Sequence, residues 1–263
     1  MGANVGEQWY REWVDRRRQV VQHFLQRRGE GVADAAVILS ALISALAADA
    51  FPRRKVKNGK NVSDARRFVQ LLVDPKILED SPFTRISIVS LPKDVTLNKR
   101  NRKEVESELE RHFVQLKGSQ NIDATLIDQD EKTLNCLLKD IIKDDNIRSK
   151  LLRGNSYAHL LYKELRCAYL HEYRAGDRVG LIASDNTQSG ALQSLAQYWI
   201  EPANNSTTQN TVRDARLLFD GGRLIDEWIP KIADNLAKQI QSGASSGKLA
   251  DVALEPPTDY WLP

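Results

Sequence analysis

An arginine and a histidine stand five positions apart in one apolar segment of the chain. Arg166 and His171 occur in the string LRCAYLHEYR, and Tyr173 follows two residues after the histidine. Histidine titrates near neutral pH and can take or give a proton, whereas arginine stays charged and can place two donors on phosphate oxygens. RNA carries its own nucleophile, the 2′-hydroxyl group. The pair is therefore suited to RNA cleavage by 2′-OH attack, without a metal ion.

The spacing alone is not specific, because it recurs in the chain. Further pairs separated by five to seven positions are Arg16, Arg17 or Arg18 with His23, and Arg153 with His159. A purely structural alternative also exists for the first pair. Arg166 could form an ion pair with a neighbouring helix, and His171 could cap a helix C-terminus, where an imidazolium is favoured.

The pair lies near the end of a helix that is expected over residues 156–174. Asn155 or Ser156 can cap its start, and Gly176 is a suitable stop signal. A step of five residues turns about 140° on an α-helix. Arg166 and His171 can therefore point the same way only if the helix ends or distorts between them.

The longer string R-x4-H-x-Y resembles the motif of ribonucleases of the HEPN superfamily. LRCAYLHEYR is also similar to the "LRN…HEY" signature that is common in these proteins. The resemblance covers residues 155–176 strongly and the remaining chain only by its helical class. It implies that Arg166 and His171 are catalytic, and that two motif helices face one cleft in a two-fold homodimer.

Two further positions take an expected role from this resemblance. In HEPN toxins paired with nucleotidyltransferase antitoxins, the tyrosine of the motif receives a nucleotide, which implies Tyr173 here. Alternatively, the ring of Tyr173 packs on the helix end and its hydroxyl group bonds to nearby backbone. Cys167 departs from the superfamily, in which Asn, Asp or His often follows the arginine and helps to orient the site.

Helical periodicity dominates the rest of the chain, so the expected fold class is mainly α. The expected architecture is a HEPN-like helical bundle with a small antiparallel β insertion after the motif helix, all in one domain over residues 1–241. Other helices are expected over residues 7–28, 32–51, 63–73, 99–116, 130–143, 146–153 and 223–241. Short strands are expected over residues 86–91, 179–183, 195–200 and 215–219. Residues 242–263 read as a flexible tail that begins as a Ser/Gly linker.

The formal net charge is only +3, so any nucleic-acid surface must come from local clusters. Arg16 and Arg17 belong to a basic run in the first expected helix, and Arg53, Arg54 and Lys55 to a basic loop. Both clusters are candidates for RNA phosphate contacts. The alternative is a solvated helix face and a solvated loop.

Several other classes of protein find no support in the sequence. The two cysteines provide neither a disulfide framework nor a zinc pattern, and P-loop, dinucleotide-binding, zinc-protease and serine-hydrolase motifs are absent. No metal or cofactor is therefore expected. Residues 32–51 are apolar, but Asp34 and Asp49 bracket a centre too short for a bilayer, so a buried core helix is expected. With no signal-peptide pattern, the expected location is the cytoplasm.

These observations favour a metal-independent endoribonuclease that acts in defence or in a toxin–antitoxin pair. The expected partners are RNA, a second copy of the chain, and a nucleotidyltransferase antitoxin or another defence-system protein, with no membrane. The alternative is a non-catalytic HEPN-like helical module with a binding or regulatory role.

Overall fold

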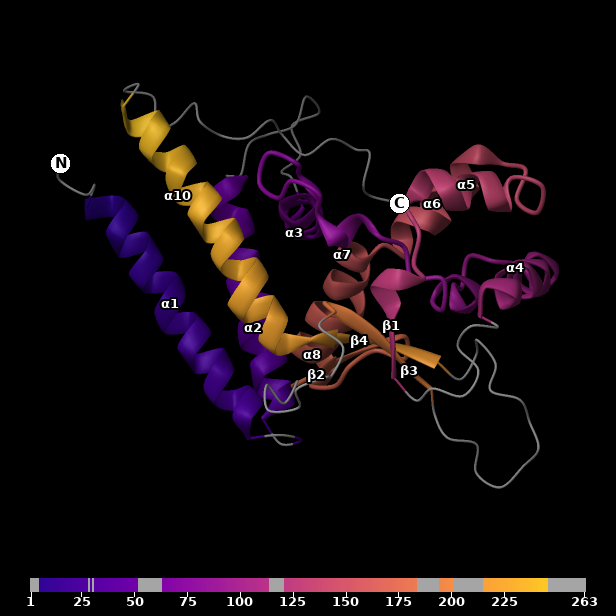
Figure 1. Cartoon of the computed structure of the whole chain (residues 1–263), viewed down its shortest axis with the longest axis horizontal. Coiled ribbons are helices and arrows are strands. Elements are labelled where there is room, and N and C mark those ends of the chain that lie inside the picture. The colour runs from indigo at the N-terminus through magenta and orange to yellow at the C-terminus, as the bar shows by residue number, and fades with distance from the viewer. Residues whose placement is uncertain are drawn as a thin grey trace.

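A computed structural model describes residues 5–27, 29, 31–51, 63–113, 121–183, 194–200 and 215–245. Three long helices lie side by side at one end of the molecule, and shorter helices gather at the other end (Figure 1). A small sheet and the helix with the Arg/His motif lie between these groups. The expected fold class, mainly helical with a small sheet, is confirmed in these residues.

The long helices are α1 (Val5–Gln26), α2 (Val32–Ala50) and α10 (Ile229–Ser245). α2 is the central one, because it contacts α1, α10, α3 (Asp64–Val73) and the motif helix. Its core side chains, Leu39, Ile43 and Leu46 among them, are almost completely buried. In the described part of the chain, α2 is also the one helix long and apolar enough to cross a bilayer. Its packing agrees with the expected buried core helix.

The shorter helices are α4 (Lys99–Phe113), α5 (Glu131–Leu138) and α6 (Asp145–Gly154), and α5 ends five residues before the end of the helix predicted over residues 130–143. The helix predicted over residues 223–241 begins as α9 (Gly221–Arg223) and continues through a π-helical segment (Leu224–Trp228) into α10. Side chains cap several helices where the sequence indicates it: Ser63 accepts a hydrogen bond from the Arg66 N–H at the start of α3. α10 ends at Ser245, and residues 246–263 of the expected tail lie outside the described residues.

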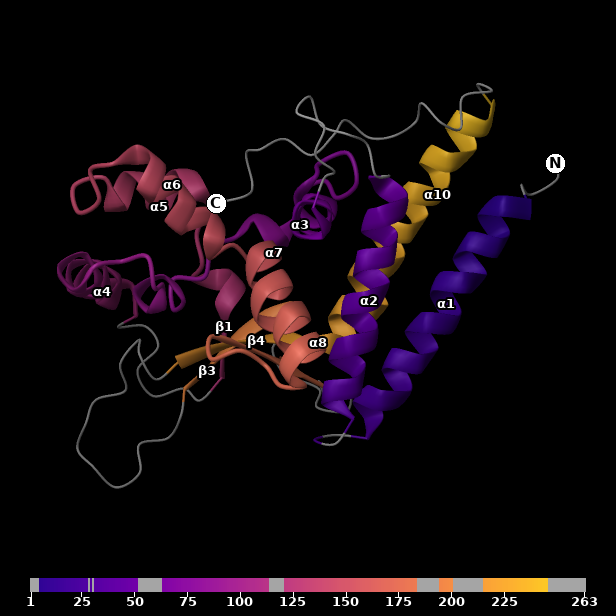
Figure 2. The same ribbon diagram turned by 180° about the vertical axis from the view of Figure 1, so that it is seen from behind.

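The motif helix, Tyr157–Glu172, has three parts. It consists of α7 (Tyr157–Leu160), a π-helical segment (Leu161–Cys167) and α8 (Ala168–Glu172). Ser156 caps its start by accepting a hydrogen bond from the His159 N–H. It packs against α2 on the side away from α1 (Figure 2). Lys163 is exposed in the middle of this helix, and at its C-terminal end Leu170, His171 and Glu172 are exposed.

The sheet is mixed, so the prediction of an antiparallel unit is only partly right. Its strands are β1 (Asn121–Asp123), β2 (Val179–Ile182), β3 (Ala196–Ile200) and β4 (Ala215–Asp220), in the order β1-β3-β4-β2. β3 pairs antiparallel with β1 and β4, but β2 pairs parallel with β4. β1 also precedes the motif helix, so the sheet is not only an insertion after it.

Burial explains the parallel pairing of β2. Val179, Gly180 and Leu181 are all buried, so this strand is covered on both faces, as is usual for parallel strands. A Cβ atom on Gly180 would lie 2.7 Å from Cδ2 of Leu218 in β4, so a larger residue would require the Leu218 side chain to shift. A long connection links β2 to β3, and a connection of that length does not require the two strands to be antiparallel neighbours.

The prediction of a strand over residues 86–91 is wrong. Its backbone bonds to several separate segments instead of to one strand: Ile86 N–H donates to Gln129 O, Ser87 N–H to Asn155 O, and Ile88 N–H to the side chain of Asp128. A 3-10 helix begins at Leu91. The apolar side chains that suggested a strand are buried because the segment passes through the core.

Candidate active site

The motif helix is distorted at the arginine and ends two residues after the histidine. Arg166 belongs to the π-helical segment, which closes at Cys167, and His171 lies in the last turn of α8. Tyr173 ends the helix in the left-handed conformation, with φ 55° and ψ 29°. The π-helical distortion therefore covers Arg166 and the residues before it, whereas the chain from Ala168 to His171 is regular α-helix, so the distortion expected between the two side chains is not present over most of that interval. π-Helical segments are frequent at functional sites.

Arg166 is held from three helices and is largely buried, with 15% of its side chain exposed. Its Nε donates to Ser44 Oγ of α2 at 2.9 Å, and its guanidinium carbon lies 5.0 Å from the centre of the Tyr162 ring. One terminal nitrogen lies 3.5 Å from a carboxylate oxygen of Asp64, at the start of α3. The ion pair with a neighbouring helix that the structural alternative required is therefore present.

His171 is exposed, unlike Arg166. Within the described residues, its ring makes no hydrogen bond or ion pair, and the helix-ending backbone bond runs from Tyr173 N–H to Tyr169 O. The ring does not cap the helix, although it lies in the last turn. Leu170 and Tyr173 are exposed beside it, at 44% and 58%. The end of the motif helix thus combines a free imidazole with exposed apolar surface.

Tyr173 and Cys167 occupy different surroundings. The Tyr173 hydroxyl group donates to the carboxylate of Asp34, in the first turn of α2, and this hydrogen bond raises the pKa of the phenol. Among the described residues, this hydroxyl group makes no hydrogen bond to backbone, and the side chain is more than half exposed. Cys167 is half-buried, with its Sγ 4.0 Å from a guanidinium nitrogen of Arg166. The thiol therefore lies beside the arginine.

Two buried polar contacts fix the motif helix. The Tyr157 hydroxyl group, at its start, donates to Asp128 Oδ2 at 2.6 Å. Glu164, in the π-helical segment, accepts from Arg178 Nε at 2.9 Å, and its backbone oxygen accepts from Gly176 N–H. The chain after the helix is thereby folded back onto it. Arg166 is presented from an immobilised helix, which suits a site that requires fixed geometry.

The other Arg/His pairs are in less suitable positions. Burial lowers the pKa of His159 to about 4, and Arg153 forms an ion pair with Glu131 at 3.1 Å. Arg18 donates to the Ile225 carbonyl oxygen and pairs with Asp15, so its guanidinium is occupied within the fold. His23 is exposed on α1. The pair in the motif helix is the one in which an exposed histidine follows a helical distortion.

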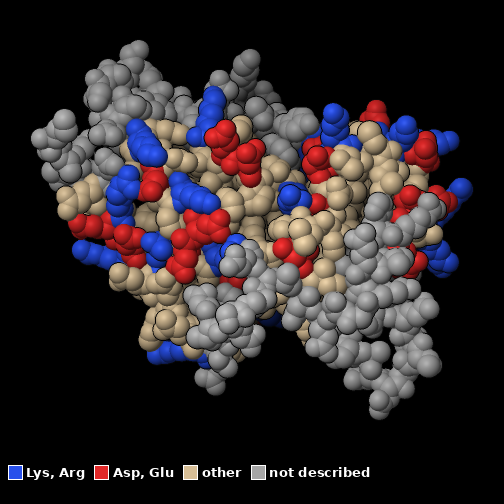
Figure 3. All heavy atoms as spheres, viewed as in Figure 1, with Lys and Arg blue, Asp and Glu red and all other residues tan. Residues whose placement is uncertain are grey.

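The candidate RNA-binding residues of α1 are exposed but lie among acidic groups. Arg16 and Arg17 point away from the buried stripe of α1, and the face around α1 and α10 carries interleaved cationic and anionic side chains (Figure 3). α2 separates α1 from the motif helix (Figure 2). The structure therefore does not bring Arg16 and Arg17 together with Arg166. The candidates Arg53, Arg54 and Lys55 lie outside the described residues.

The partners of the motif residues were not predicted from the sequence. Ser44, Asp64 and Asp34 lie 122, 102 and 139 positions from the side chains they contact, and no local pattern indicates them. Tyr162 is different, because its place one helical turn before Arg166 could have indicated the contact. Among the described residues, no cluster of three or more His, Cys, Asp or Glu side chains could hold a metal ion.

Comparison with known proteins adds no family. No protein-family model matches the chain, and neither curated proteins nor solved structures give a significant match. The function is therefore argued from the geometry of the motif helix and from the chemistry of its side chains.

Proposed function

We propose that the protein is a metal-independent endoribonuclease of the HEPN type, with Arg166 and His171 as its catalytic residues. The observation that carries the proposal is the end of the motif helix. Within one distorted helix, the Arg166 guanidinium is anchored by Ser44, and five residues later stands an exposed imidazole that makes no hydrogen bond or ion pair with the described residues. An imidazole is suited to proton transfer near neutral pH, and a guanidinium to stabilising a phosphorane.

The contacts of Arg166 leave it able to bind phosphate. Its Nε–Ser44 bond has ordinary length, but the nitrogens facing Tyr162 and Asp64 each lie 3.5 Å from the acceptor, at the outer limit of a hydrogen bond. A phosphate group can take these terminal donors while Ser44 keeps hold of Nε. The guanidinium would then have the bidentate geometry that arginine offers to phosphate.

The reaction follows from the two side chains. An imidazole removes the proton of the 2′-hydroxyl group, and the 2′-oxygen attacks the neighbouring phosphorus atom. Arg166 stabilises the charge of the phosphorane, and the P–O5′ bond breaks. A protonated imidazole gives its proton to the 5′-oxygen, which leaves a 2′,3′-cyclic phosphate and a 5′-hydroxyl group. One imidazole cannot be base and acid in the same step, so His171 of a second copy supplies the other function.

The surface beside His171 is consistent with that second copy. Leu170 and Tyr173 leave apolar area exposed at the end of the motif helix. In a two-fold dimer this patch would contact itself, and both histidines would lie near the axis. The segment with Arg53, Arg54 and Lys55 supplies cationic side chains that we expect to bind RNA phosphates.

The experiment is cleavage of a labelled single-stranded RNA by the purified full-length protein in EDTA. Arg166→Ala and His171→Ala should each lower the rate by about 100-fold or more, the effect typical of lost acid–base or electrostatic catalysis. His23→Ala and Arg100→Ala are matched controls, because both side chains are exposed on other helices, α1 and α4. The products should carry 2′,3′-cyclic phosphates, and a 2′-deoxy nucleotide at the cleavage position should block the reaction.

Equal cleavage by the wild type and both motif variants would refute the proposal. Loss of cleavage in EDTA, with recovery in magnesium, would indicate an acidic metal site instead.

A second candidate function is a non-catalytic helical module with a binding or regulatory role. The contacts of Arg166 with Ser44, Asp64 and Tyr162 favour it, because they explain the arginine as a clamp between helices. In that case Arg166→Ala should lower the melting temperature while His171→Ala changes neither stability nor any RNA cleavage. If the protein is a ribonuclease, His171→Ala should instead abolish RNA cleavage while leaving the melting temperature unchanged.

A further inference from the structure

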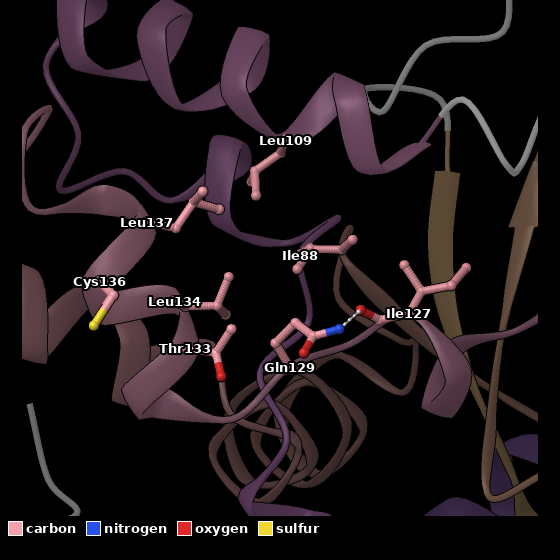
Figure 4. A pocket seen from close by; sticks show the side chains of 8 residues that line it. All are labelled: Ile88, Leu109, Ile127, Gln129, Thr133, Leu134, Cys136 and Leu137. Atoms are coloured by element: carbon pink, nitrogen blue, oxygen red, sulfur yellow. Dashed lines mark hydrogen bonds between the residues drawn. The ribbon is translucent and has the colours of Figure 1, made fainter.

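A second concave site lies on the far side of the molecule from the long helices. It is a pocket of about 460 Å³ between α4, α5 and the chain segments around Ile88 and Ile127 (Figure 4). Its lining residues are Ile88, Leu109, Ile127, Gln129, Thr133, Leu134, Cys136 and Leu137. None of them belongs to the motif helix, and the proposed ribonuclease does not use this pocket.

The inner wall is apolar and the rim is polar. Ile88, Leu109 and Leu134 are each at most 1% exposed, whereas Thr133 and Cys136 are exposed at the mouth. Water in contact with such a wall finds few hydrogen-bond partners, so replacing it with an apolar group is favourable. The volume lies within the roughly 300–1,000 Å³ typical of small-molecule sites.

One side chain in the pocket retains an unused acceptor. Gln129 donates from Nε2 to the Ile127 carbonyl oxygen at 2.9 Å, which fixes the direction of its amide. Within the described residues, Gln129 Oε1 accepts no hydrogen bond. Figure 4 shows this amide between Ile127 and Leu134, level with the apolar lining. A ligand with one N–H or O–H group against an otherwise apolar body would match this arrangement.

The walls are fixed before any ligand arrives. Ile88 N–H donates at 3.0 Å to Asp128, a buried carboxyl group that also binds Tyr157. Asp130 caps α5 by accepting from the Thr133 N–H at 2.7 Å. A preformed site loses little conformational entropy on binding, which favours affinity for a small ligand.

From these features we infer that the pocket is a binding site for a small, mainly apolar molecule that donates one hydrogen bond to Gln129. The closed inner wall and the single unused acceptor suit a compact molecule better than a helix or strand of another protein. A helix or strand of a partner protein binds in a groove that offers several anchor positions at regular intervals. This inference is independent of the ribonuclease proposal.

The test uses N-phenyl-1-naphthylamine, an uncharged aromatic fluorophore that carries one N–H donor, with the full-length protein. The wild type should bind it at one saturable site. Thr133→Trp and Cys136→Trp place an indole at the mouth and should each weaken binding about tenfold or more, a change of about 1.4 kcal/mol. Lys132→Trp is the matched control, since this neighbour on α5 is exposed and does not line the pocket. It should bind within about twofold of the wild type.

A further variant tests the polar contact. Gln129→Met keeps the length of the side chain and removes the acceptor, so it should weaken binding roughly fivefold, as expected for loss of one hydrogen bond. Circular dichroism and thermal melting establish that each variant is folded.

The inference is overturned if no saturable binding occurs, or if both indole variants at the mouth bind the fluorophore as the wild type does. It is also overturned if the occupant is the end of this chain, Tyr260-Trp261-Leu262. In that case, Trp261→Ala in the full-length protein would raise the affinity for the fluorophore, and a synthetic peptide of residues 254–263 would displace it.

Discussion

Arg166 and Asp64 face each other across 102 positions of sequence, with 3.5 Å between a guanidinium nitrogen and a carboxylate oxygen. The other oxygen of Asp64 accepts a hydrogen bond from Arg67, so one carboxylate is shared by two arginines. The Asp64 side chain is 52% exposed. A partly exposed ion pair contributes little to stability, about 0–1 kcal/mol. The larger effect of the Asp64 carboxylate is electrostatic, because its negative charge repels a phosphate group that approaches Arg166.

Removal of that carboxylate charge should strengthen RNA binding. In Asp64→Asn, the phosphate no longer competes with an anion for the terminal nitrogens of Arg166. The dissociation constant for single-stranded RNA should fall roughly fivefold at low salt, which corresponds to about 1 kcal/mol. The difference should shrink as salt is raised, because salt screens exposed charges. Fluorescence anisotropy with the uncleaved 2′-deoxy substrate measures it.

Asp145→Asn is the matched control for this change. Asp145 is likewise the first residue of a helix and pairs with an arginine three positions later, Arg148, but it lies in α6, away from the motif helix. The Asp145→Asn substitution changes the net charge of the protein by the same amount as Asp64→Asn. If both variants bind RNA equally well, the effect is one of net charge, and Asp64 does not compete at Arg166.

Asp128 gives the fold a specific dependence on pH. It is completely buried, and burial raises the pKa of its carboxyl group from 3.8 to about 7, against hydrogen bonds from Tyr157 and Tyr198 that lower it. The folded chain thus holds this proton more tightly than the unfolded chain. The stability from this group is fully present below about pH 4 and is lost as pH rises through 7.

Asp128→Asn should remove this pH dependence. The amide has the shape of the protonated acid and does not titrate. The free energy of unfolding of the wild type should therefore fall relative to that of Asp128→Asn between pH 5 and pH 8, by on the order of a few kcal/mol. Urea unfolding across this pH range provides the measurement. Parallel curves for the two proteins would mean that Asp128 is ionised throughout.

Local signals in the sequence were enough to predict most helices and to identify the motif. The apolar periodicity of α1 and α2 and the caps at Ser63 and Ser156 are properties of adjacent residues, and all were predicted. A distortion between Arg166 and His171 was expected from the rotation per residue of a helix, but the π-helical segment ends at Cys167 and lies mostly before that interval.

Long-range pairing could not be predicted in the same way. Residues 86–91 have the composition of a strand, yet their backbone bonds run to Gln129, Asn155 and Asp128, which only the tertiary structure brings near. The parallel partner of β2 depends on its burial on both faces. The partners of Arg166 and Tyr173 are set by the packing of α2 and α3, so the sequence indicated the catalytic candidates but not what holds them.

Leu170 should contribute to assembly. It is exposed beside His171, and a two-fold contact through this patch would bring two copies of the side chain together. Leu170→Glu would then place like charges at the axis. The dissociation constant of the homodimer should rise about tenfold or more, as seen by sedimentation, and cleavage should fall at low protein concentration.

Leu126→Glu is the control for this substitution. Leu126 is 77% exposed and lies on the 3-10 helix after β1, next to the segment that contacts the start of the motif helix and not its His171 end. It should leave assembly and cleavage unchanged. A wild-type protein that is monomeric at micromolar concentration and fully active would contradict the two-copy site, whatever Leu170→Glu does.

Tyr173 is the residue through which we propose that a partner controls the site. Its ring is 58% exposed, and its hydroxyl group donates to the carboxylate of Asp34. A nucleotidyltransferase would join the phenol oxygen to the α-phosphorus of a nucleoside triphosphate, with release of pyrophosphate and with Asp34 placed to accept the phenol proton. The attached nucleotide would add bulk and negative charge two residues from His171, where an RNA phosphate must lie.

Tyr173→Phe separates this role from a structural one, because it keeps the ring and removes the oxygen that would be modified. The side chain is exposed, so loss of this one hydrogen bond should leave the melting temperature nearly unchanged, and RNA cleavage should continue. The variant should escape inhibition by a co-expressed nucleotidyltransferase, and intact-mass measurement should show the added nucleotide on the wild type alone. Asp34→Asn should slow the modification and leave cleavage unchanged. If Tyr173→Phe unfolds, or loses activity with no partner present, then the hydroxyl group serves the fold or the reaction itself, and control by modification must be abandoned.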